Sequence, residues 1–199
     1  MRIIAGAHRG RSIRPPADQK TTRPITDRVK EALFNRLHSL GVLGYGRVLD
    51  IYCGTGSMGL EALSRGAEHA LFVDRDATAL RLLRQNIDTL GETHRARVEP
   101  ADALAGAYLF GVGDGEVTAA FLDPPYADAD PQRDALGALL LKLHPKLEPG
   151  GVVVLRTPSD VDPPALEEAL FDTASTRYGG MTLHFFQSPL PVADEAADV

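Results

Sequence analysis

The 199-residue sequence has one cysteine, no tryptophan and only short apolar runs. A single cysteine, Cys53, cannot form a disulfide within the chain, which suits a cytoplasmic protein. No apolar run approaches the ~20 residues of a membrane-spanning helix, and the N-terminus lacks the apolar core of a signal peptide. The six histidines are scattered along the chain. We therefore expect neither membrane association nor a metal site.

Charge is divided unevenly along the chain. The net charge is −6, but residues 1–30 hold eight basic and two acidic side chains, and the remaining residues hold 13 basic and 25 acidic ones. A +6 segment on a −12 body is typical of an arm that binds a polyanion. The alternative is a disordered basic leader. We predict nucleic-acid contacts from Arg2, His8, Arg9, Arg11, Arg14, Arg23 and Arg28.

The pattern within this basic arm favours an ordered structure. Residues 2–6 and 10–14 are strand-like runs around a glycine-containing turn, which predicts a β-hairpin. Thr26 is a good N-cap for the helix that follows, and we expect Arg28 and Lys30 on its exposed face. The other face of that helix is apolar and comprises Val29, Leu33, Phe34 and Leu37.

A glycine loop follows the first buried strand of the body. Residues 47–51 read as that strand, and the spacing Gly54-x-Gly56-x-x-Gly59 leads into a helix over 60–65. Strand, glycine turn and helix form the context of a nucleotide-binding fingerprint. Asp50, just before the glycines, would repel a pyrophosphate but accept hydrogen bonds from a cationic amino-acid moiety. S-adenosylmethionine carries such a moiety and no phosphate.

Acidic residues also follow the next two predicted strands. Asp74 ends the strand over 69–73 and lies twenty residues after Gly54, where it is placed for ribose hydroxyls. Asp102 follows the strand over 96–99 and is placed for an adenine amine. The alternative for Asp102 and Asp76 is helix N-capping. The predicted cofactor site comprises Asp50, Cys53 (a small filler of the loop), Gly54, Gly56, Gly59, Asp74, Arg75, Asp102 and Ala103.

The tetrapeptide Asp123-Pro124-Pro125-Tyr126 follows an apolar run over 117–122 that reads as a buried strand. Two prolines fix φ twice and remove two N–H donors, so the turn is stiff and its carbonyls point outward. Asp123 and the Pro124 carbonyl can accept hydrogen bonds from a planar amine, while Tyr126 stacks on the attached base. This is an arrangement for methylating a nucleobase amine. Taken alone, the tetrapeptide also fits an ordinary surface turn.

Patterns in the last third of the chain complete an α/β fold. Residues 132–144 and 163–170 read as helices, and residues 152–155 as a strand. Residues 177–186 read as a closing antiparallel hairpin around Gly179-Gly180. The tail from 189 to 199 is acidic, and we expect it to be disordered.

The chain resembles the bacterial 16S ribosomal RNA guanine-N2 methyltransferases of the RsmD type up to about Ser188. The discriminating blocks are residues 1–11 and 23–35, and the glycine loop through Gly66 and the Asp-Pro-Pro-Tyr turn also fit. Two positions depart from the family pattern: Arg156 stands where a glutamate is usual, so the role of that glutamate is not carried over to it, and Cys53 replaces an alanine.

The resemblance implies a Rossmann-like, class I S-adenosylmethionine-dependent methyltransferase fold. It implies a seven-stranded, mostly parallel sheet closed by an antiparallel hairpin, over residues 41–188, with an N-terminal hairpin and helix extension over 1–40. The implied reaction is methylation of the N2 amine of a guanine in small-subunit ribosomal RNA. The implied partner is that RNA or the small ribosomal subunit, and the short chain without heptads favours a monomer.

Two other functions stay open from the sequence. Adenine-N6 methyltransferases of DNA can carry the same tetrapeptide, although 199 residues leave no room for their usual target-recognition domain. A catalytically silent RNA-binding assembly factor could keep the fold, although the intact glycine loop speaks against it. Guanine offers N1–H and N2–H₂ donors side by side to a carboxylate, which favours guanine over adenine.

Overall fold

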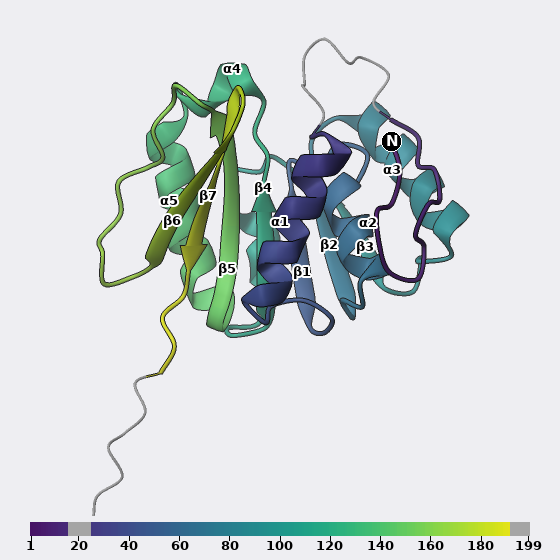
Figure 1. The fold of residues 1–199 in the computed structure, drawn as a ribbon, viewed down its shortest axis with the longest axis horizontal. Coiled ribbons are helices and arrows are strands. Elements are labelled where there is room, and N and C mark those ends of the chain that lie inside the picture. Colours follow the sequence, from purple (N-terminus) through teal and green to yellow (C-terminus); the bar gives the residue numbers. More distant parts are fainter. Residues whose placement is uncertain (16–24, 192–199) are drawn as a thin grey trace, which may run out of the picture.

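The computed structural model describes residues 1–15 and 25–191. Within this part of the chain, seven strands form one sheet in the order β3-β2-β1-β4-β5-β7-β6 (Figure 1). Arg23 and residues 192–199 of the acidic tail lie outside the described residues, so the predictions for them stay predictions. The strands are β1 (Arg47–Ile51), β2 (His69–Asp74), β3 (Ala96–Pro100), β4 (Val117–Leu122), β5 (Leu147–Pro158), β6 (Asp172–Tyr178) and β7 (Met181–Gln187).

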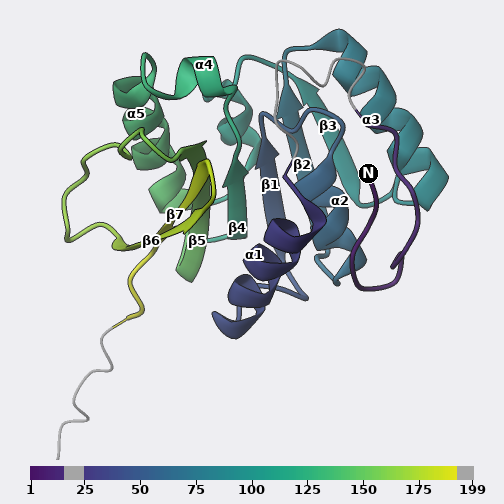
Figure 2. The same cartoon turned by 45° about the horizontal axis from the view of Figure 1, so that its top comes forward.

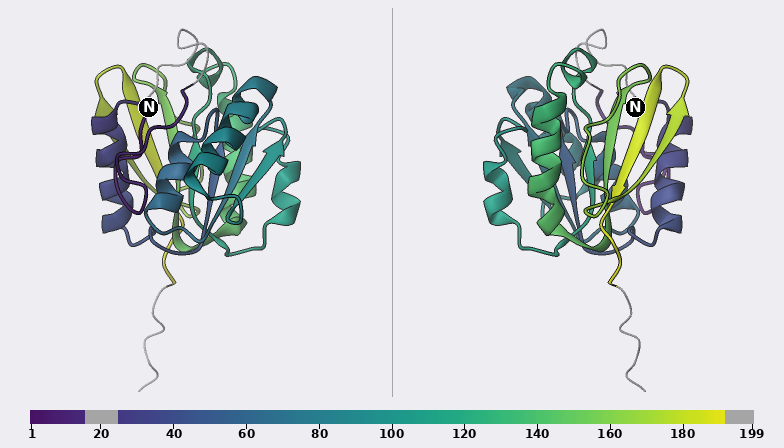
Figure 3. Two further views of the ribbon diagram at one scale, coloured as in Figure 1. Left: turned by 90° about the vertical axis from the view of Figure 1, so that its right-hand side faces the viewer. Right: turned by 90° about the vertical axis from the view of Figure 1, so that its left-hand side faces the viewer.

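Helices cover both faces of the sheet (Figure 3). Successive residues of the central strands point to opposite faces, so Val48 packs in one buried cluster and Leu49 in the other. One cluster contains apolar residues of α1, α2 and α3, and the other those of α5 and η1. The helices are α1 (Asp27–Ser39), α2 (Ser57–Ser64), α3 (Ala77–Leu90), α4 (Tyr126–Ala129) and α5 (Arg133–Leu143), with 3₁₀ turns η1 (Ala107–Gly111) and η2 (His144–Lys146).

The sheet topology places the ends of β1 and β4 next to each other. Strands β1 to β5 are all parallel, and β1 pairs with β2 on one side and with β4 on the other. The chain order therefore reverses between β1 and β4, and open α/β sheets bind ligands at the carboxyl ends of the strands at such a switch point. Figure 2 turns this edge toward the viewer, with α4 following β4. The predicted closing hairpin is confirmed, since β7 runs antiparallel to both β5 and β6.

The N-terminal arm forms a short hairpin that is fixed to the body. Its two runs pair through an antiparallel bridge between Arg2 and Ser12, and Ile3 N–H donates to the Arg11 carbonyl at 3.0 Å. Ile3 and Ile13 are buried in the same cluster as the apolar residues of α2 and α3. The arm thus shares its core with the sheet, and Figure 1 shows it lying beside α2 and α3.

Helix α1 begins as predicted, but one of its basic residues is buried. The Thr26 hydroxyl accepts a hydrogen bond from Val29 N–H, which makes Thr26 the N-cap. Lys30 was expected on the exposed face but is 1 % exposed and pairs with the buried Glu61 at 3.3 Å. Lys30 precedes Phe34 by four residues, so a 3.6-residue period puts both on one face. Burial lowers the pKa of Lys30, while Glu61 acts in the opposite direction.

The prediction of a helix over residues 163–170 is wrong. The segment is irregular and ends in a turn, in which Leu170 N–H donates to the Glu167 carbonyl. A proline disfavours the helical conformation of the residue before it, so Pro163 and Pro164 hold Asp162 and Pro163 out of a helix. Leu166 and Leu170 still pack against the cluster under α5, so the segment buries its apolar side chains without helical structure. Among the described residues, no helix is both long and apolar enough to cross a membrane.

Candidate active site at the carboxyl edge of the sheet

The glycine loop connects β1 to α2 in a path that side chains would obstruct. Gly56 has a φ of 86° and precedes the first turn of α2. A Cβ on Gly59 would lie 2.3 Å from the Phe72 ring of β2, so only glycine lets α2 approach the sheet this closely. Cys53 is buried beside the loop, and its N–H donates to the Val73 carbonyl. The predicted role of Cys53 as a small filler agrees with this position.

Asp50 is the buried carboxylate behind this loop. Its Oδ2 accepts a hydrogen bond from Gly59 N–H at 2.8 Å, in the first turn of α2. Burial raises the pKa of Asp50 to about 8, and the negative charges of Asp123 and Asp74 add to the rise. Asp50 therefore holds the loop against the helix, and a cation bound beside it would favour its ionised form.

Asp74 ties the end of β2 to the same loop. Its Oδ2 accepts from Gly54 N–H at 2.8 Å, and its Oδ1 accepts from Asp76 N–H at 2.9 Å. Each oxygen has a further lone pair. The neighbouring Asp76 caps α3 by accepting from Thr78 and Ala79 N–H, so the capping interpretation is right for Asp76.

Asp102 and Arg75 face each other at the rim of this edge. Their closest charged atoms are 3.8 Å apart, and both side chains are more than half exposed. Asp102 Oδ1 also accepts from Leu104 N–H at 2.9 Å, which fixes the turn after β3. Ala103 is buried, and its carbonyl accepts from the Tyr108 hydroxyl. We call residues 50–59, 74–76 and 102–104 the cofactor half of the site.

Tyr52 is a site residue that the sequence patterns did not single out. It has a φ of 60°, the one positive φ outside glycine among the described residues, and such strain is concentrated at functional sites. Its buried hydroxyl, like those of Thr55 and Ser57, has no hydrogen-bond partner in the described structure. Burial raises the pKa of Tyr52 to about 12. Buried hydroxyls are normally hydrogen-bonded, so these three are available to a ligand or to water.

The Asp-Pro-Pro-Tyr turn lies beside the glycine loop. Asp123 N–H donates to the Ile51 carbonyl at 3.2 Å, which joins the ends of β4 and β1 directly. Pro124 is buried, and after Pro125 the chain turns into α4, which begins at Tyr126. The turn thus lies at the switch point of the sheet. This position does not favour the alternative of an ordinary surface turn.

Arg156, at the end of β5, contacts this turn. Its Nε donates to Asp123 Oδ1 at 2.5 Å, and its Cζ lies 5.4 Å from the centre of the Tyr126 ring. Burial raises the pKa of Asp123, and the Arg156 charge opposes that rise. The sequence marked Arg156 only as a departure from a family pattern, and the ion pair was not predicted. We call residues 123–126 together with Arg156 the acceptor half.

The predicted nucleic-acid residues divide into two groups. Arg2, Arg9, Arg11, Arg14 and Arg28 are exposed. His8 is half-buried instead, and its Nε2 lies 2.5 Å from Oε1 of the buried Glu92. Burial alone would raise the pKa of Glu92, but hydrogen bonds from Arg95 and His8 outweigh it and lower that pKa. The His8 ring therefore fixes the arm to the body, and its contact with RNA stays a prediction.

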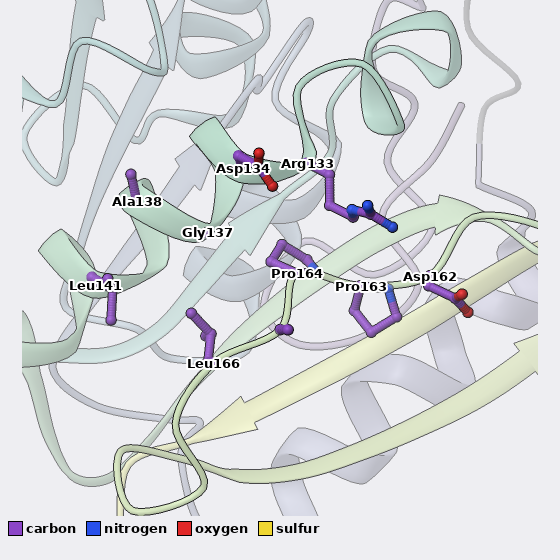
Figure 4. A pocket seen from close by; sticks show the side chains of 10 residues that line it. Arg133, Asp134, Gly137, Ala138, Leu141, Asp162, Pro163, Pro164 and Leu166 are labelled. Atoms are coloured by element: carbon purple, nitrogen blue, oxygen red, sulfur yellow. The ribbon is translucent and has the colours of Figure 1, made fainter.

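A separate cavity of about 570 Å³ lies between α5 and the irregular segment after β5 (Figure 4). It is lined by Arg133, Asp134, Leu141, Asp162 and Leu166, among others. None of its lining residues belongs to the predicted site. Among residues 1–15 and 25–191, no group of three or more histidine, cysteine or acidic side chains could hold a metal ion.

Known proteins are similar to this chain in sequence. The family model described as "Conserved hypothetical protein 95" matches residues 1–187. The chain belongs to this family. "Putative rRNA methyltransferase YlbH" of Bacillus subtilis is 37% identical over 181 residues, covering 90% of this chain and 94% of that protein. "Ribosomal RNA small subunit methyltransferase D" of Escherichia coli K12 is 39% identical over 126 residues, covering 63% and 60%. The RsmD-type resemblance is thereby confirmed.

Solved structures of similar proteins have the same fold. An Escherichia coli protein described as "Putative methyltransferase yhhF" aligns with a TM-score of 0.76 at 28% identity, over 95% of this chain and 98% of its own. A hypothetical protein of Thermus thermophilus aligns with a TM-score of 0.73 at 33% identity, over 94% and 98%. An RNA methyltransferase of Salinibacter ruber, solved with S-adenosyl-L-homocysteine, shares the fold at 18% identity and a TM-score of 0.56. The predicted class I methyltransferase fold is confirmed.

Proposed function

We propose that this protein transfers a methyl group from S-adenosylmethionine to the exocyclic N2 amine of a guanine in small-subunit ribosomal RNA. The observation that carries the proposal is the placement of the Asp123 turn against the end of β1, directly beside the glycine loop. A donor site and an acceptor site are thus adjacent at one edge of the sheet. The ribosomal RNA methyltransferases among the relatives support RNA rather than DNA as substrate.

The cofactor half suits S-adenosylmethionine. Asp50 stands behind the first turn of α2, where a pyrophosphate-binding fold would present unopposed N–H groups. Asp74 and Asp102 offer carboxylate oxygens for hydroxyl and amine donors, and Tyr52 and Thr55 bring buried hydroxyls that lack partners. When bound, S-adenosylmethionine supplies an electrophilic methyl group on a sulfonium centre. We assign its binding to the nine cofactor residues predicted from the sequence and to Tyr52, which the structure adds.

The acceptor half suits a planar amine on a base. An exocyclic amine is a weak nucleophile because its lone pair is delocalised into the ring. Hydrogen bonds from its N–H groups to Asp123 and the Pro124 carbonyl favour a pyramidal nitrogen whose lone pair is available for reaction. Orientation and exclusion of water supply most of the acceleration in this scheme. Asp123 need not be a strong base, because the amine becomes acidic once it is methylated.

The target base must leave its stack to reach this turn. Tyr126 replaces the lost stacking, and one base–aromatic stack contributes roughly 1–3 kcal/mol. The exposed arginines of the arm and Arg28 bind the RNA backbone, which supplies affinity without sequence specificity. We propose that the protein acts on ribosomal RNA or the small subunit as a monomer.

Methyl transfer to ribosomal RNA tests the proposal. Small subunits and deproteinised RNA, from cells that lack this protein, are incubated with it and isotope-labelled S-adenosylmethionine, and the nucleosides are analysed by mass spectrometry. We expect one labelled N2-methylguanosine. N6-methyladenosine on a DNA substrate would support the adenine-N6 alternative, and cofactor binding without transfer to either nucleic acid would contradict the proposed reaction. A silent assembly factor would bind RNA but not the cofactor.

A further inference from the structure

Arg156 contacts both side chains that the proposed reaction uses to hold the acceptor base. The register pairs Leu122 of β4 with Leu155 of β5, so Arg156, still within β5, lies level with Asp123, the first residue after β4. Its Nε lies 2.5 Å from Asp123 Oδ1, and its Cζ lies 5.4 Å from the Tyr126 ring centre. A cation over an aromatic face at this distance is attracted to it. One guanidinium therefore fixes the carboxylate and the stacking ring relative to each other.

The guanidinium approaches the carboxylate from inside the fold. The Arg156 side chain is 6% exposed, whereas the Asp123 side chain is 24% exposed. If Arg156 blocked the acceptor pocket, the opposite order would be expected, with the arginine exposed and the carboxylate covered. The geometry thus leaves part of Asp123 open to an incoming amine while Arg156 supports it from behind.

The charges around Asp123 explain why it needs a cation. Burial raises the pKa of Asp123, and it also raises the pKa of Asp50 on β1, to which the charges of Asp123 and Asp74 on β2 contribute. Arg156 on β5 is the cation that opposes the rise. Without it, a desolvated carboxylate among other carboxylates would take up a proton. A neutral carboxyl accepts hydrogen bonds more weakly than a carboxylate.

We propose that Arg156 is a positioning residue for methyl transfer, which orients Asp123 toward the acceptor amine and opposes its protonation. This inference rests on the proposed function, because it assigns Arg156 a role in that same site. It predicts that replacing Arg156 lowers the rate of methyl transfer but leaves the affinity for the cofactor nearly unchanged. Arg156 contacts Asp123, whereas Asp50 and Asp74 accept hydrogen bonds from the backbone N–H groups of Gly59 and Gly54.

The test compares Arg156→Gln with Arg156→Lys, which keeps the charge but not the guanidinium geometry. At neutral pH we expect Arg156→Gln to lower kcat roughly 10- to 100-fold, as a misplaced reacting group does. Because the pKa of Asp123 rises when Arg156 is lost, the acid limb of the kcat–pH profile should move to higher pH. In Arg156→Lys the acid limb should stay near that of the wild type. Cofactor affinity, measured by calorimetry, should stay within a few-fold in both variants.

Arg177→Gln is the matched control, because it removes an exposed arginine near the end of β6, which β7 separates from β5. It should leave kcat and the acid limb unchanged. Wild-type turnover and an unmoved acid limb in Arg156→Gln would overturn the inference, and increased turnover would show that Arg156 blocks the site instead. If Arg156→Gln does not fold, Arg156→Lys decides, because an acid limb displaced upward in that variant contradicts a role for the charge.

A second readout does not depend on activity. Carbon-13 NMR of the Asp123 carboxyl, in wild type and in the Arg156 variants, should show a higher pKa in Arg156→Gln than in Arg156→Lys. If the wild type transfers no methyl group to RNA, the proposed function fails, and this titration still tests the ion pair. Equal pKa values in all three proteins would contradict the inference by itself.

Discussion

The cofactor half and the acceptor half of the site hold their carboxylates in different ways. In the cofactor half, Asp50, Asp74 and Asp102 each accept a hydrogen bond from a backbone N–H. In the acceptor half, Asp123 Oδ1 accepts from the side chain of Arg156, 33 residues away. Backbone donors are supplied by the loop conformation itself, whereas a side-chain donor can be lost in one substitution. The cofactor half should therefore tolerate neighbouring changes better than the acceptor half.

The largest expected effect separates the two halves directly. Asp123→Ala should lower methyl transfer by about 10²- to 10³-fold, because it removes the acceptor that orients the amine. Cofactor affinity by calorimetry should stay within a few-fold. The control is Asp123→Asn, which keeps the shape of the side chain and should also be nearly inactive. Loss of cofactor binding in both variants would contradict the separation, because it would show that Asp123 also holds the cofactor.

The next prediction concerns stability in the cofactor half. The pKa of Asp50 is about 8 in the folded protein and about 3.9 in an unfolded chain, so the folded state binds more protons between these values. The contribution of Asp50 to the free energy of unfolding should therefore fall as pH rises from about 4 to about 8, and level off above. Asp50→Asn cannot titrate, and its amide oxygen can still accept from Gly59.

Urea unfolding at pH 5, 7 and 9 checks this prediction. Relative to the wild type, Asp50→Asn should gain stability with rising pH while binding the cofactor less tightly. Asp88→Asn, on the exposed face of α3, is the matched control and should show no such trend. A stability difference that is constant across pH would indicate that Asp50 is already ionised in the folded protein at pH 5.

Asp74 tests whether the cofactor half acts on binding rather than on turnover. Asp74→Ala removes the anchor of Gly54 and the oxygens assigned to the ribose. We expect the Kd for S-adenosylmethionine to rise roughly 10- to 100-fold, the equivalent of one or two charged hydrogen bonds. The maximal rate at saturating cofactor should change little. Normal cofactor dependence would remove Asp74 from the site.

The smallest expected effect concerns the basic arm. Deleting residues 1–14 would expose the core, because Ile3 and Ile13 are buried in it. Arg9→Gln with Arg14→Gln instead removes two exposed charges. If both contact phosphates, the slope of log affinity for ribosomal RNA against log salt should fall by about 1.4 to 1.8. Arg81→Gln with Arg84→Gln, on the exposed face of α3, is the matched control. An unchanged slope in the arm variant would exclude these two arginines from the RNA surface.

Local patterns in the sequence were enough to predict the glycine loop, the turn after β4 and the start of α1. Glycine spacing after a buried strand fixed the loop, because side chains cannot follow its path at Gly56 or pack at Gly59. The turn residues fixed Asp123 at the end of β4, and Thr26 fixed the start of α1. These features need only a residue and its near neighbours, so a pattern in one sequence shows them.

Which charged side chains pair with each other depends on the tertiary structure. The register of β4 on β5 brings Arg156 to Asp123, and the packing of α1 beside α2 brings Lys30 to Glu61. Neither pair has a characteristic spacing in the sequence. Whether a charge is buried depends on everything that packs around it, because the cost of desolvation must be offset by partners from other elements. For that reason the glycine loop could be predicted from the sequence, whereas the ion pair between Arg156 and Asp123 could not.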